Sequence, residues 1–151
     1  MKPWRKFVCV LLAAALAACA VPAWAAPAAW DGQAADTAWY DAAKAEYVLS
    51  TPAQLAGLAA LVNSGTDFAN KTVALGADMD LGGHEWTPIG MGTRGTPGAN
   101  DHYFTGTFDG QGHSILNLSV SMDLDQHGAG LFGAVQNAVI RNVNIASGNV
   151  A

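Results

Sequence analysis

The side chains that could carry catalysis or bind a metal are few and lie apart in the sequence. His84-Glu85 begins like the zinc-binding H-E-x-x-H motif, but Pro88 stands where the second histidine belongs. The pair also follows two glycines and has no helical pattern around it. His113 and His127 have no Ser or Cys partner at a motif spacing. The sequence therefore predicts no catalytic residue, no metal site and no bound cofactor.

Aspartates at alternating positions form the second group with chemical potential. Asp78 and Asp80 share one face of a predicted strand, and Asp123 and Asp125 share another. Calcium takes about six to eight oxygen ligands, and no Asp-Gly calcium-loop pattern is present, so a solvated acidic face is the favoured interpretation. A polysaccharide-cleaving site would need two carboxylates across a groove, for which Asp109 and Asp123 are the candidates. Asp109 lies in a glycine-flanked corner, which favours a role in a turn.

A pattern that occurs twice after residue 104 predicts the fold that would position these side chains. Gly106-Thr107-Phe108 and Gly130-Leu131-Phe132 both read G-x-F, and 115–120 and 140–145 both read I-x-N-[LV]-x-[VI]. The copies are offset by about 25 residues, a period typical of solenoids in which each repeat forms one coil. Two hairpins that agree by chance are the alternative. We predict parallel coils.

The two copies also predict a register and a bend. Asparagine tolerates the left-handed backbone that a sharp bend requires, so the chain should turn at Asn117 and at Asn142. Stacked amides would then form an Asn ladder. Partners about 4.8 Å apart are expected to be Phe108 over Phe132, Ile115 over Ile140, Asn117 over Asn142, Leu118 over Val143 and Val120 over Ile145.

Before the coils, the sequence predicts a strand, a helix and a second strand. The first strand is 47–49, and Thr51-Pro52-Ala53-Gln54 is typical of a helix start with Pro at the first position. Leu55, Leu58 and Val62 share one helical face, and Gly65 supplies a stop. This face should close the N-terminal end of the coils. Alternation over 72–81 predicts one strand that enters the first coil.

The first 25 residues read as an export leader. Three basic residues precede an apolar run that ends near Val21, and Ala23-Trp24-Ala25 fits a cleavage site. The run is too short and wrongly flanked for a membrane span. A second interpretation is a lipoprotein box ending at Cys19, which would anchor the product by a lipid. Cleavage after Ala25 is favoured because Pro22 and the small residues suit it, and both interpretations place the product outside the cytoplasm.

Removal of the leader leaves an acidic chain without cysteine. The leader contains three of the seven basic residues and none of the twelve acidic ones, so the remaining chain carries 4 − 12 = −8 formal charges. This charge disfavours nucleic acids and anionic membranes as partners. Cys9 and Cys19 both lie in the leader, so packing and backbone hydrogen bonds must hold the fold without disulfides.

Aromatic residues in 26–46 would either anchor a strap across the end of the fold or line a sugar site.

Several short stretches of the mature chain occur in a specific order: Trp30-Asp31-Gly32, Asp36-Thr37-x-Trp39-Tyr40, Ser50-Thr51-x3-Leu55-Ala56-Gly57-Leu58, Ala77-Asp78-Met79-Asp80-Leu81, Trp86-Thr87-Pro88-Ile89-Gly90, Phe104-x-Gly106-x-Phe108-Asp109-Gly110 and Gly130-Leu131-Phe132-Gly133. Together they resemble the N-terminal region of bacterial surface proteins that carry the GLUG motif. The resemblance implies a right-handed parallel β-helix on an exported, often longer protein, and it implies no catalytic residues.

The sequence thus predicts four segments of a mostly-β chain. These are a signal peptide (1–25), an Ala-rich strap (26–46), a capping strand-helix-strand region with a loop (47–103) and β-helix coils (104–151) with an open C-terminal end. We expect a secreted or cell-surface structural or adhesive module, with a polysaccharide-binding or polysaccharide-processing protein as the alternative.

The expected partners are an extracellular glycan or a host or cell-wall protein, besides self-association through the open end. Trp86 and Tyr103, which lie in a stretch rich in Gly and Pro, would be the exposed aromatics of a glycan site.

Overall fold

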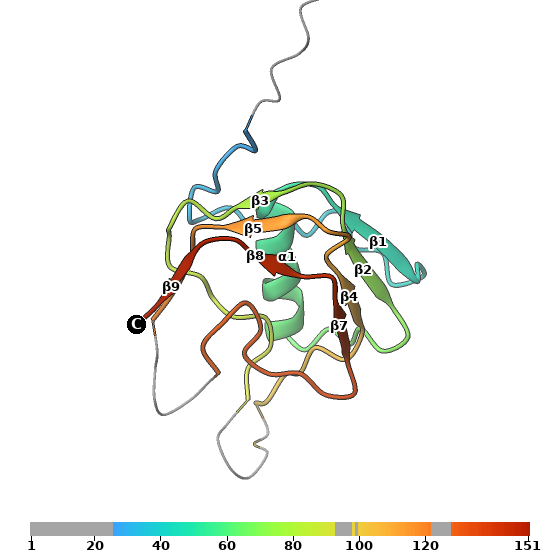
Figure 1. Cartoon of the computed structure of the whole chain (residues 1–151). Coiled ribbons are helices and arrows are strands. Elements are labelled where there is room, and N and C mark those ends of the chain that lie inside the picture. Colours follow the sequence, from blue (N-terminus) through green and yellow to red (C-terminus); the bar gives the residue numbers. More distant parts are fainter. Residues whose placement is uncertain (1–25, 93–97, 99, 122–127) are drawn as a thin grey trace, which may run out of the picture.

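The computed structural model describes residues 26–92, 98, 100–121 and 128–151, and it is mostly β (Figure 1). Its elements in chain order are β1 (Glu46–Leu49), α1 (Pro52–Asn63), β2 (Thr72–Leu75), β3 (Met79–Asp80), β4 (Thr107–Asp109), β5 (Ser114–Leu116), β6 (Leu118–Val120), β7 (Val139–Arg141), β8 (Asn144–Ile145) and β9 (Gly148–Val150).

The strands form three sheets with the orders β1-β2-β4-β7, β3-β5-β8 and β6-β9, and every pair of strands is parallel. In each sheet the strands follow chain order, so each pass of the chain adds its strands to the same edges. We call one such pass a turn. Figure 1 shows the last turn, β7 to β9, running around three sides with α1 crossing behind it. The prediction of parallel strands is confirmed.

The predicted register is wrong. Phe108 pairs with Ile140, Ile115 with Ile145, and Leu118 with Gly148. The last two turns are therefore offset by 32 residues in the first sheet and by 30 in the others, not by 25. The reason is that Ile115-Leu116-Asn117 ends β5 and Ile140-Arg141-Asn142 ends β7, so the same corner sequence serves two different corners. Phe108 and Phe132 nevertheless touch, with ring centroids 5.2 Å apart.

Both predicted corner asparagines adopt the left-handed backbone, with φ of 56° at Asn117 and 54° at Asn142. Asn117 lies between β5 and β6, and Asn142 lies between β7 and β8, so the chain bends at both asparagines as predicted. The predicted Asn ladder is wrong, because each amide binds an aspartate of the preceding turn instead. The Nδ2 of Asn117 donates to Asp80 at 2.8 Å, and that of Asn142 donates to Asp109 at 2.9 Å.

The helix α1 forms where predicted and is covered on more than one side. Thr51 is its N-cap and accepts from Gln54 N, while Gln54 Oε1 accepts from Ser50 N at 2.8 Å. Leu55, Leu58 and Val62 are almost fully buried in the core, so the predicted face is confirmed. On its other side the strap approaches closely, and Asp36 N donates to Ala53 O at 2.9 Å. A Cβ at Gly57 would collide with the Asp36 carbonyl, so only glycine fits.

The single strand predicted over 72–81 is in fact two strands in different sheets. Val73, Leu75, Met79 and Leu81 are all buried, so the predicted alternation is correct. The chain turns a corner between β2 and β3, at Gly76, where a Cβ would lie 2.6 Å from Val48 Cγ1. Alternation alone does not reveal this corner, because the inward positions keep their phase across it.

Candidate functional surfaces

The histidines proposed as candidates have structural surroundings where they are described. His84 packs edge-on against Trp30, with ring centroids 6.4 Å apart. The Nδ1 of His113 lies 3.2 Å from Asp78 Oδ1. His127, Asp123 and Asp125 lie outside the described residues. Within the described part of the chain, no group of three or more His, Cys, Asp or Glu side chains could hold a metal ion.

Of the aspartates of the predicted solvated face, Asp78 is exposed and Asp80 is half-buried, and both also bind the next turn. Asp78 Oδ1 accepts from Ser114 N at 2.9 Å, and Asp80 Oδ1 accepts from Asn117 Nδ2 and from Gly82 N. The Ser114 amide, followed by His113, lowers the pKa of Asp78, and the Asn117 amide, followed by the Gly82 N–H, lowers the pKa of Asp80. Both carboxylates therefore join consecutive turns.

Asp109 performs the same role at the next junction and is the one buried charged side chain among the described residues. Its oxygens accept from Asn142 Nδ2 at 2.9 Å, from Gln111 N at 3.0 Å and from Arg141 Nε at 2.8 Å. These donors, the Asn142 amide first, lower the pKa of Asp109. The predicted turn role is confirmed, and an ionised, fully hydrogen-bonded Asp109 is unsuited to donate a proton as a general acid.

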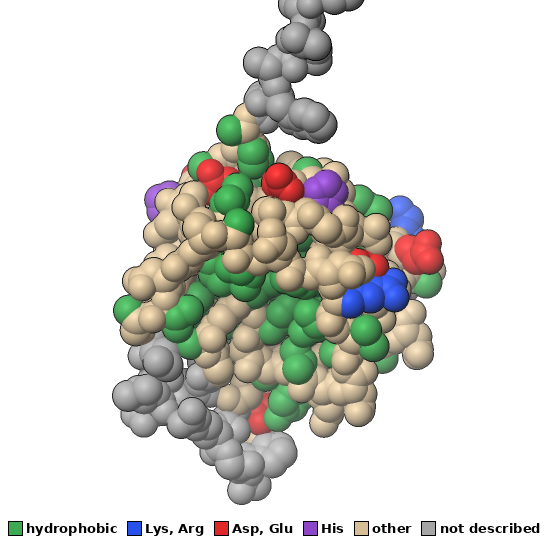
Figure 2. Space-filling model, in the orientation of Figure 1, with side chains coloured by type: hydrophobic (Ala, Val, Ile, Leu, Met, Phe, Trp, Pro, Cys, Tyr) green, Lys and Arg blue, Asp and Glu red, His purple; other side chains and the backbone are tan. Residues whose placement is uncertain are grey.

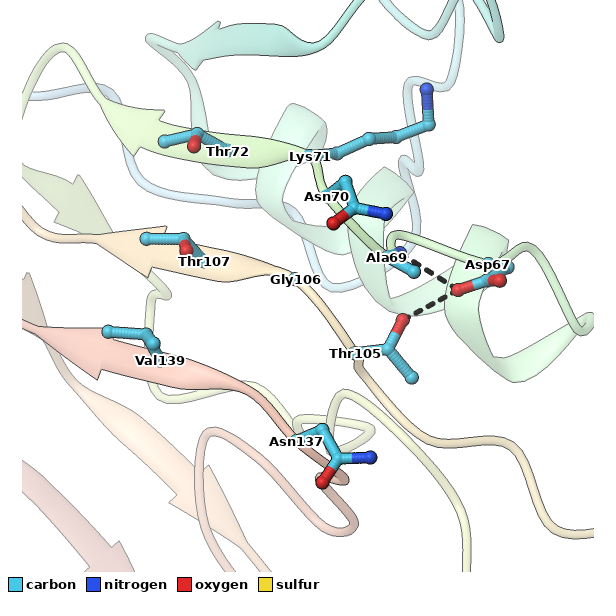
Figure 3. Close-up of a pocket in the computed structure, with 10 residues that line it drawn as sticks. All are labelled: Asp67, Ala69, Asn70, Lys71, Thr72, Thr105, Gly106, Thr107, Asn137 and Val139. Carbon is cyan, nitrogen blue, oxygen red and sulfur yellow. Dashed lines mark hydrogen bonds between the residues drawn. The ribbon is translucent and has the colours of Figure 1, made fainter.

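A groove of about 530 Å³ crosses three turns on the outer side of β2, β4 and β7 (Figure 3). Its side chains form two rows because alternate residues of a strand share a face. Thr72, Thr107 and Val139 are partners in neighbouring strands and form one row. Asn70, Thr105 and Asn137, each two residues earlier in its own turn, form the second row.

The two charged side chains of this groove, Asp67 and Lys71, form hydrogen bonds within the chain. Lys71 Nζ donates to the carbonyls of Ala42 and Lys44 at 2.8 and 2.7 Å and points away from the rows (Figure 3). Asp67 Oδ1 accepts from Thr105 Oγ1 at 2.7 Å and from Ala69 N at 2.8 Å. Those two bonds, that of Thr105 first, lower the pKa of Asp67. The two charged side chains of the groove are thus each held by hydrogen bonds to neutral groups of the chain.

Four uncharged side chains remain available in this groove. Asn70, Thr72, Thr107 and Asn137 form no side-chain hydrogen bond within the part of the chain that the structure describes. The amides can donate and accept, and so can the hydroxyls, which suits a ligand rich in hydroxyl groups. The sequence reasoning missed these rows. The sequence pattern that marks the rows is a pair of residues two positions apart. The second residue begins a strand and is polar or β-branched, and the first is polar.

The two aromatic residues predicted to be the exposed ones of a glycan site differ in their exposure. Trp86 is 1% exposed and donates from Nε1 to Leu131 O at 3.2 Å, so its predicted exposure is wrong. Tyr103 is half-buried, and its hydroxyl donates to Asp101 Oδ2 at 2.9 Å, which raises the pKa of Tyr103. Trp30, Trp39 and Tyr40 pack against the core, as the strap interpretation expects.

A second cavity of about 330 Å³ lies between the strap, α1 and residues 85–91. Trp30, Ala56 and Met91 are among its lining residues, and the Trp30 ring lies edge-on to Trp86 at 5.7 Å. The strap aromatics thus pack against the core while one of them also lines a cavity.

The last turn forms an apolar surface that we call the open end, made of β7, β8 and β9. Figure 2 shows hydrophobic side chains gathered in the middle of this face. Three large aliphatic residues of these strands, Ile140, Ile145 and Val150, are exposed by 41 to 49%. These strands are the last turn of the given sequence, and the predicted open C-terminal end stays a prediction.

Comparison with known proteins identifies a partial relative. No family model matches the chain, and no solved structure matches it significantly. Halomucin of Haloquadratum walsbyi (strain DSM 16790 / HBSQ001) is 36% identical over an alignment of 108 residues, which covers 63% of this chain and 1% of halomucin. The chain thus spans about 1% of the length of this relative. The resemblance to GLUG-motif proteins stays a prediction. The helix that the structure describes is too short to cross a membrane.

Proposed function

We propose that the protein is an exported structural or adhesive module of the cell surface, built as a right-handed parallel β-helix. The observation that carries this proposal is the strand order of the three sheets, in which every strand adds in chain order and in parallel. Such an architecture extends by adding turns, and it makes a rod that presents its side faces and loops.

Three further observations support this proposal. The aligned relative is a very long protein named halomucin, of which this chain spans about 1%, and the first 25 residues read as an export leader. The described carboxylates Asp78, Asp80 and Asp109 hold turns together and are not arranged as an acid and base pair. The resemblance to GLUG-motif surface proteins points the same way.

Export is tested by the mass of the product. We expect a secreted chain that begins Ala26-Pro27 after cleavage at Ala25, measured by intact-mass spectrometry of the culture medium. A product retained in the cytoplasm at full length would refute export. A diacylated product starting at Cys19 would replace free secretion by lipid anchoring and would keep the cell-surface assignment.

Glycan binding in the groove of Figure 3 is the second candidate function. The unpaired amides and hydroxyls of Asn70, Thr72, Thr107 and Asn137 favour a neutral polysaccharide, because uncharged groups that both donate and accept match its hydroxyl groups. The groove contains no second carboxylate beside Asp67, so binding without cleavage is expected.

A glycan array with the folded protein tests this candidate. Thr107→Ala combined with Asn137→Ala should abolish any signal, because both side chains line the groove. Ser119→Ala, on another sheet, is the matched control and should leave the signal unchanged. An array without hits on folded material would remove the glycan candidate and leave the scaffold function standing.

A further inference from the structure

The second cavity, of about 330 Å³, has a lining that combines an aromatic ring with small aliphatic side chains. Trp30 of the strap, Ala56 and Ala59 of α1, and Met91 supply the apolar part. All of the lining residues precede β4, so the last turn takes no part. The volume lies at the lower end of the range of about 300–1,000 Å³ that is typical of small-molecule sites, and it suits a ligand of ring size.

The strap wall of this cavity is held in place by its own hydrogen bonds. Trp30 donates from Nε1 to Ala34 O at 2.7 Å and from its backbone N to Asp80 O at 2.8 Å. Asp31 Oδ1 accepts from Gln33 N at 2.9 Å and from Ala34 N at 2.8 Å. The Trp30 side chain stays only partly buried. A partly exposed indole is therefore fixed at the cavity without any ligand.

The opposite wall is also tied to the rest of the fold. Asn63 donates from Nδ2 to Pro88 O at 3.0 Å and accepts at Oδ1 from Gly90 N at 2.9 Å. The two carboxylate oxygens of Glu85 accept from the N and the Oγ of Ser121 at 2.8 and 3.0 Å. Because both walls are held by the chain itself, the cavity is preformed, and a ligand would not have to order it.

The polar groups of the lining indicate the chemistry of the ligand. Gln33 and Thr87 form no side-chain hydrogen bond within the part of the chain that the structure describes, so an amide and a hydroxyl are available. Glu85 is the one charged residue among the described lining residues. An acidic ligand would be repelled by Glu85 and by the −8 formal charge (4 − 12) of the chain after residue 25.

We propose that this cavity binds a single neutral sugar residue, such as one at the end or at a branch of a glycan. A sugar ring has C–H groups on its faces and hydroxyls around its edge. The C–H groups match the indole and alanine part of the lining, and the hydroxyls match Gln33, Thr87 and the Glu85 carboxylate. The cavity shares no lining residue with the groove of Figure 3, and this inference depends neither on export nor on a ligand in that groove.

Saturation-transfer NMR with the methyl glycosides of glucose, galactose, mannose and N-acetylglucosamine tests this site. At least one of these glycosides should receive saturation from the folded protein. Ala60→Leu should abolish the transfer, because Ala60 lines the cavity from an exposed position on α1 and the larger side chain would occupy the space. Ala43→Leu is the matched control and should leave the transfer unchanged, since Ala43 is exposed on the strap and is not among the lining residues.

Two further comparisons sharpen the test. Thr87→Val keeps the shape of the side chain and removes its hydroxyl, so the transfer should become weaker while the circular dichroism stays that of the parent. If Ala60→Leu loses its fold, Thr87→Val decides. The methyl glycoside of glucuronic acid should receive less saturation than the neutral glycosides, because its carboxylate would meet that of Glu85.

Three results would overturn the proposal. Absence of transfer to all four neutral glycosides would show that the cavity does not hold a sugar. Transfer left intact by either folded variant would place the sugar elsewhere on the protein. Equal transfer to the glucuronic acid glycoside would contradict the assignment of a neutral ligand.

Discussion

At one end of the stack of turns, α1 covers the core and leaves Leu55 and Leu58 fully buried, whereas at the other end Ile145 and Val150 stay 46 and 49% exposed. The side chains at both ends are of similar type, so composition does not explain the difference. A turn of parallel strands buries its apolar side chains only when a helix or another turn covers it. The covered end should thus contribute more to the folding stability of these turns than the last turn does.

The largest expected effect is the difference in stability between an aspartate substitution in β6 and one in β9, the two strands of the third sheet. Leu118→Asp should prevent folding, because Leu118 is 3% exposed and a carboxylate there would be buried without a partner. Val150→Asp should leave a folded protein, since Val150 is half exposed. Circular dichroism and urea titration of both variants measure this. Equal tolerance of the two substitutions would contradict the assignment of Leu118 to the interior.

Truncation at the two ends should give a smaller but measurable difference. Leu58→Ala is expected to lower the free energy of unfolding by about 3 kcal/mol, a value within the range for buried leucines. Ile145→Ala should cost roughly 1 kcal/mol or less in the monomer, because about half of its side chain already contacts water. Urea unfolding at a low protein concentration compares them. If Ile145→Ala cost as much as Leu58→Ala, the open end would be covered in the monomer.

Acid should loosen the junctions between turns. The pKa values of Asp67, Asp78, Asp80 and Asp109 are lowered in the folded chain. Carboxylates with lowered folded pKa values stabilise the protein above their unfolded pKa, and this contribution is lost as pH falls through the lowered values. The free energy of unfolding should therefore be steady well above the ordinary value of 3.8 and decrease below it. Urea midpoints measured as a function of pH test this.

The variant Asp80→Asn sharpens the acid prediction, because it removes one titrating junction while keeping an acceptor for the Asn117 amide. Its stability should be lower than that of the parent at neutral pH and should decrease less on acidification. An unchanged pH dependence would show that Asp80 does not contribute to the acid response.

The smallest expected effect concerns the start of the covering helix. Thr51→Ala removes the side-chain acceptor of Gln54 N and should cost about 1 kcal/mol. The measurement is again the urea midpoint, with Thr51→Ser as the control that keeps the hydroxyl. A loss shared by the serine variant would mean that the methyl group, and not the cap, matters.

The sequence predicted the elements whose signals are local. The capping residues Thr51 and Gln54, the corners at Asn117 and Asn142, and the inward positions of 72–81 follow from backbone preference and alternation, which neighbouring residues determine. Parallel pairing also followed from the repeated pattern.

The register could not be predicted, because one corner sequence serves two corners and the lengths of the intervening loops decide the offset. The roles of Asp78 and Asp80 were missed for a related reason. Their donors lie more than thirty residues away, in the next turn. The burial of Trp86 likewise depends on Leu131, which is distant in sequence. The rows of the groove become visible only once the register is known.

The stacking of the turns is tested most directly by nuclear Overhauser contacts between backbone protons of neighbouring strands. The structure predicts contacts of Phe108 with Ile140, of Ile115 with Ile145 and of Val120 with Val150, in the pattern of parallel strands. Contacts of Ile115 with Ile140, or an antiparallel pattern between β4 and β7, would contradict it.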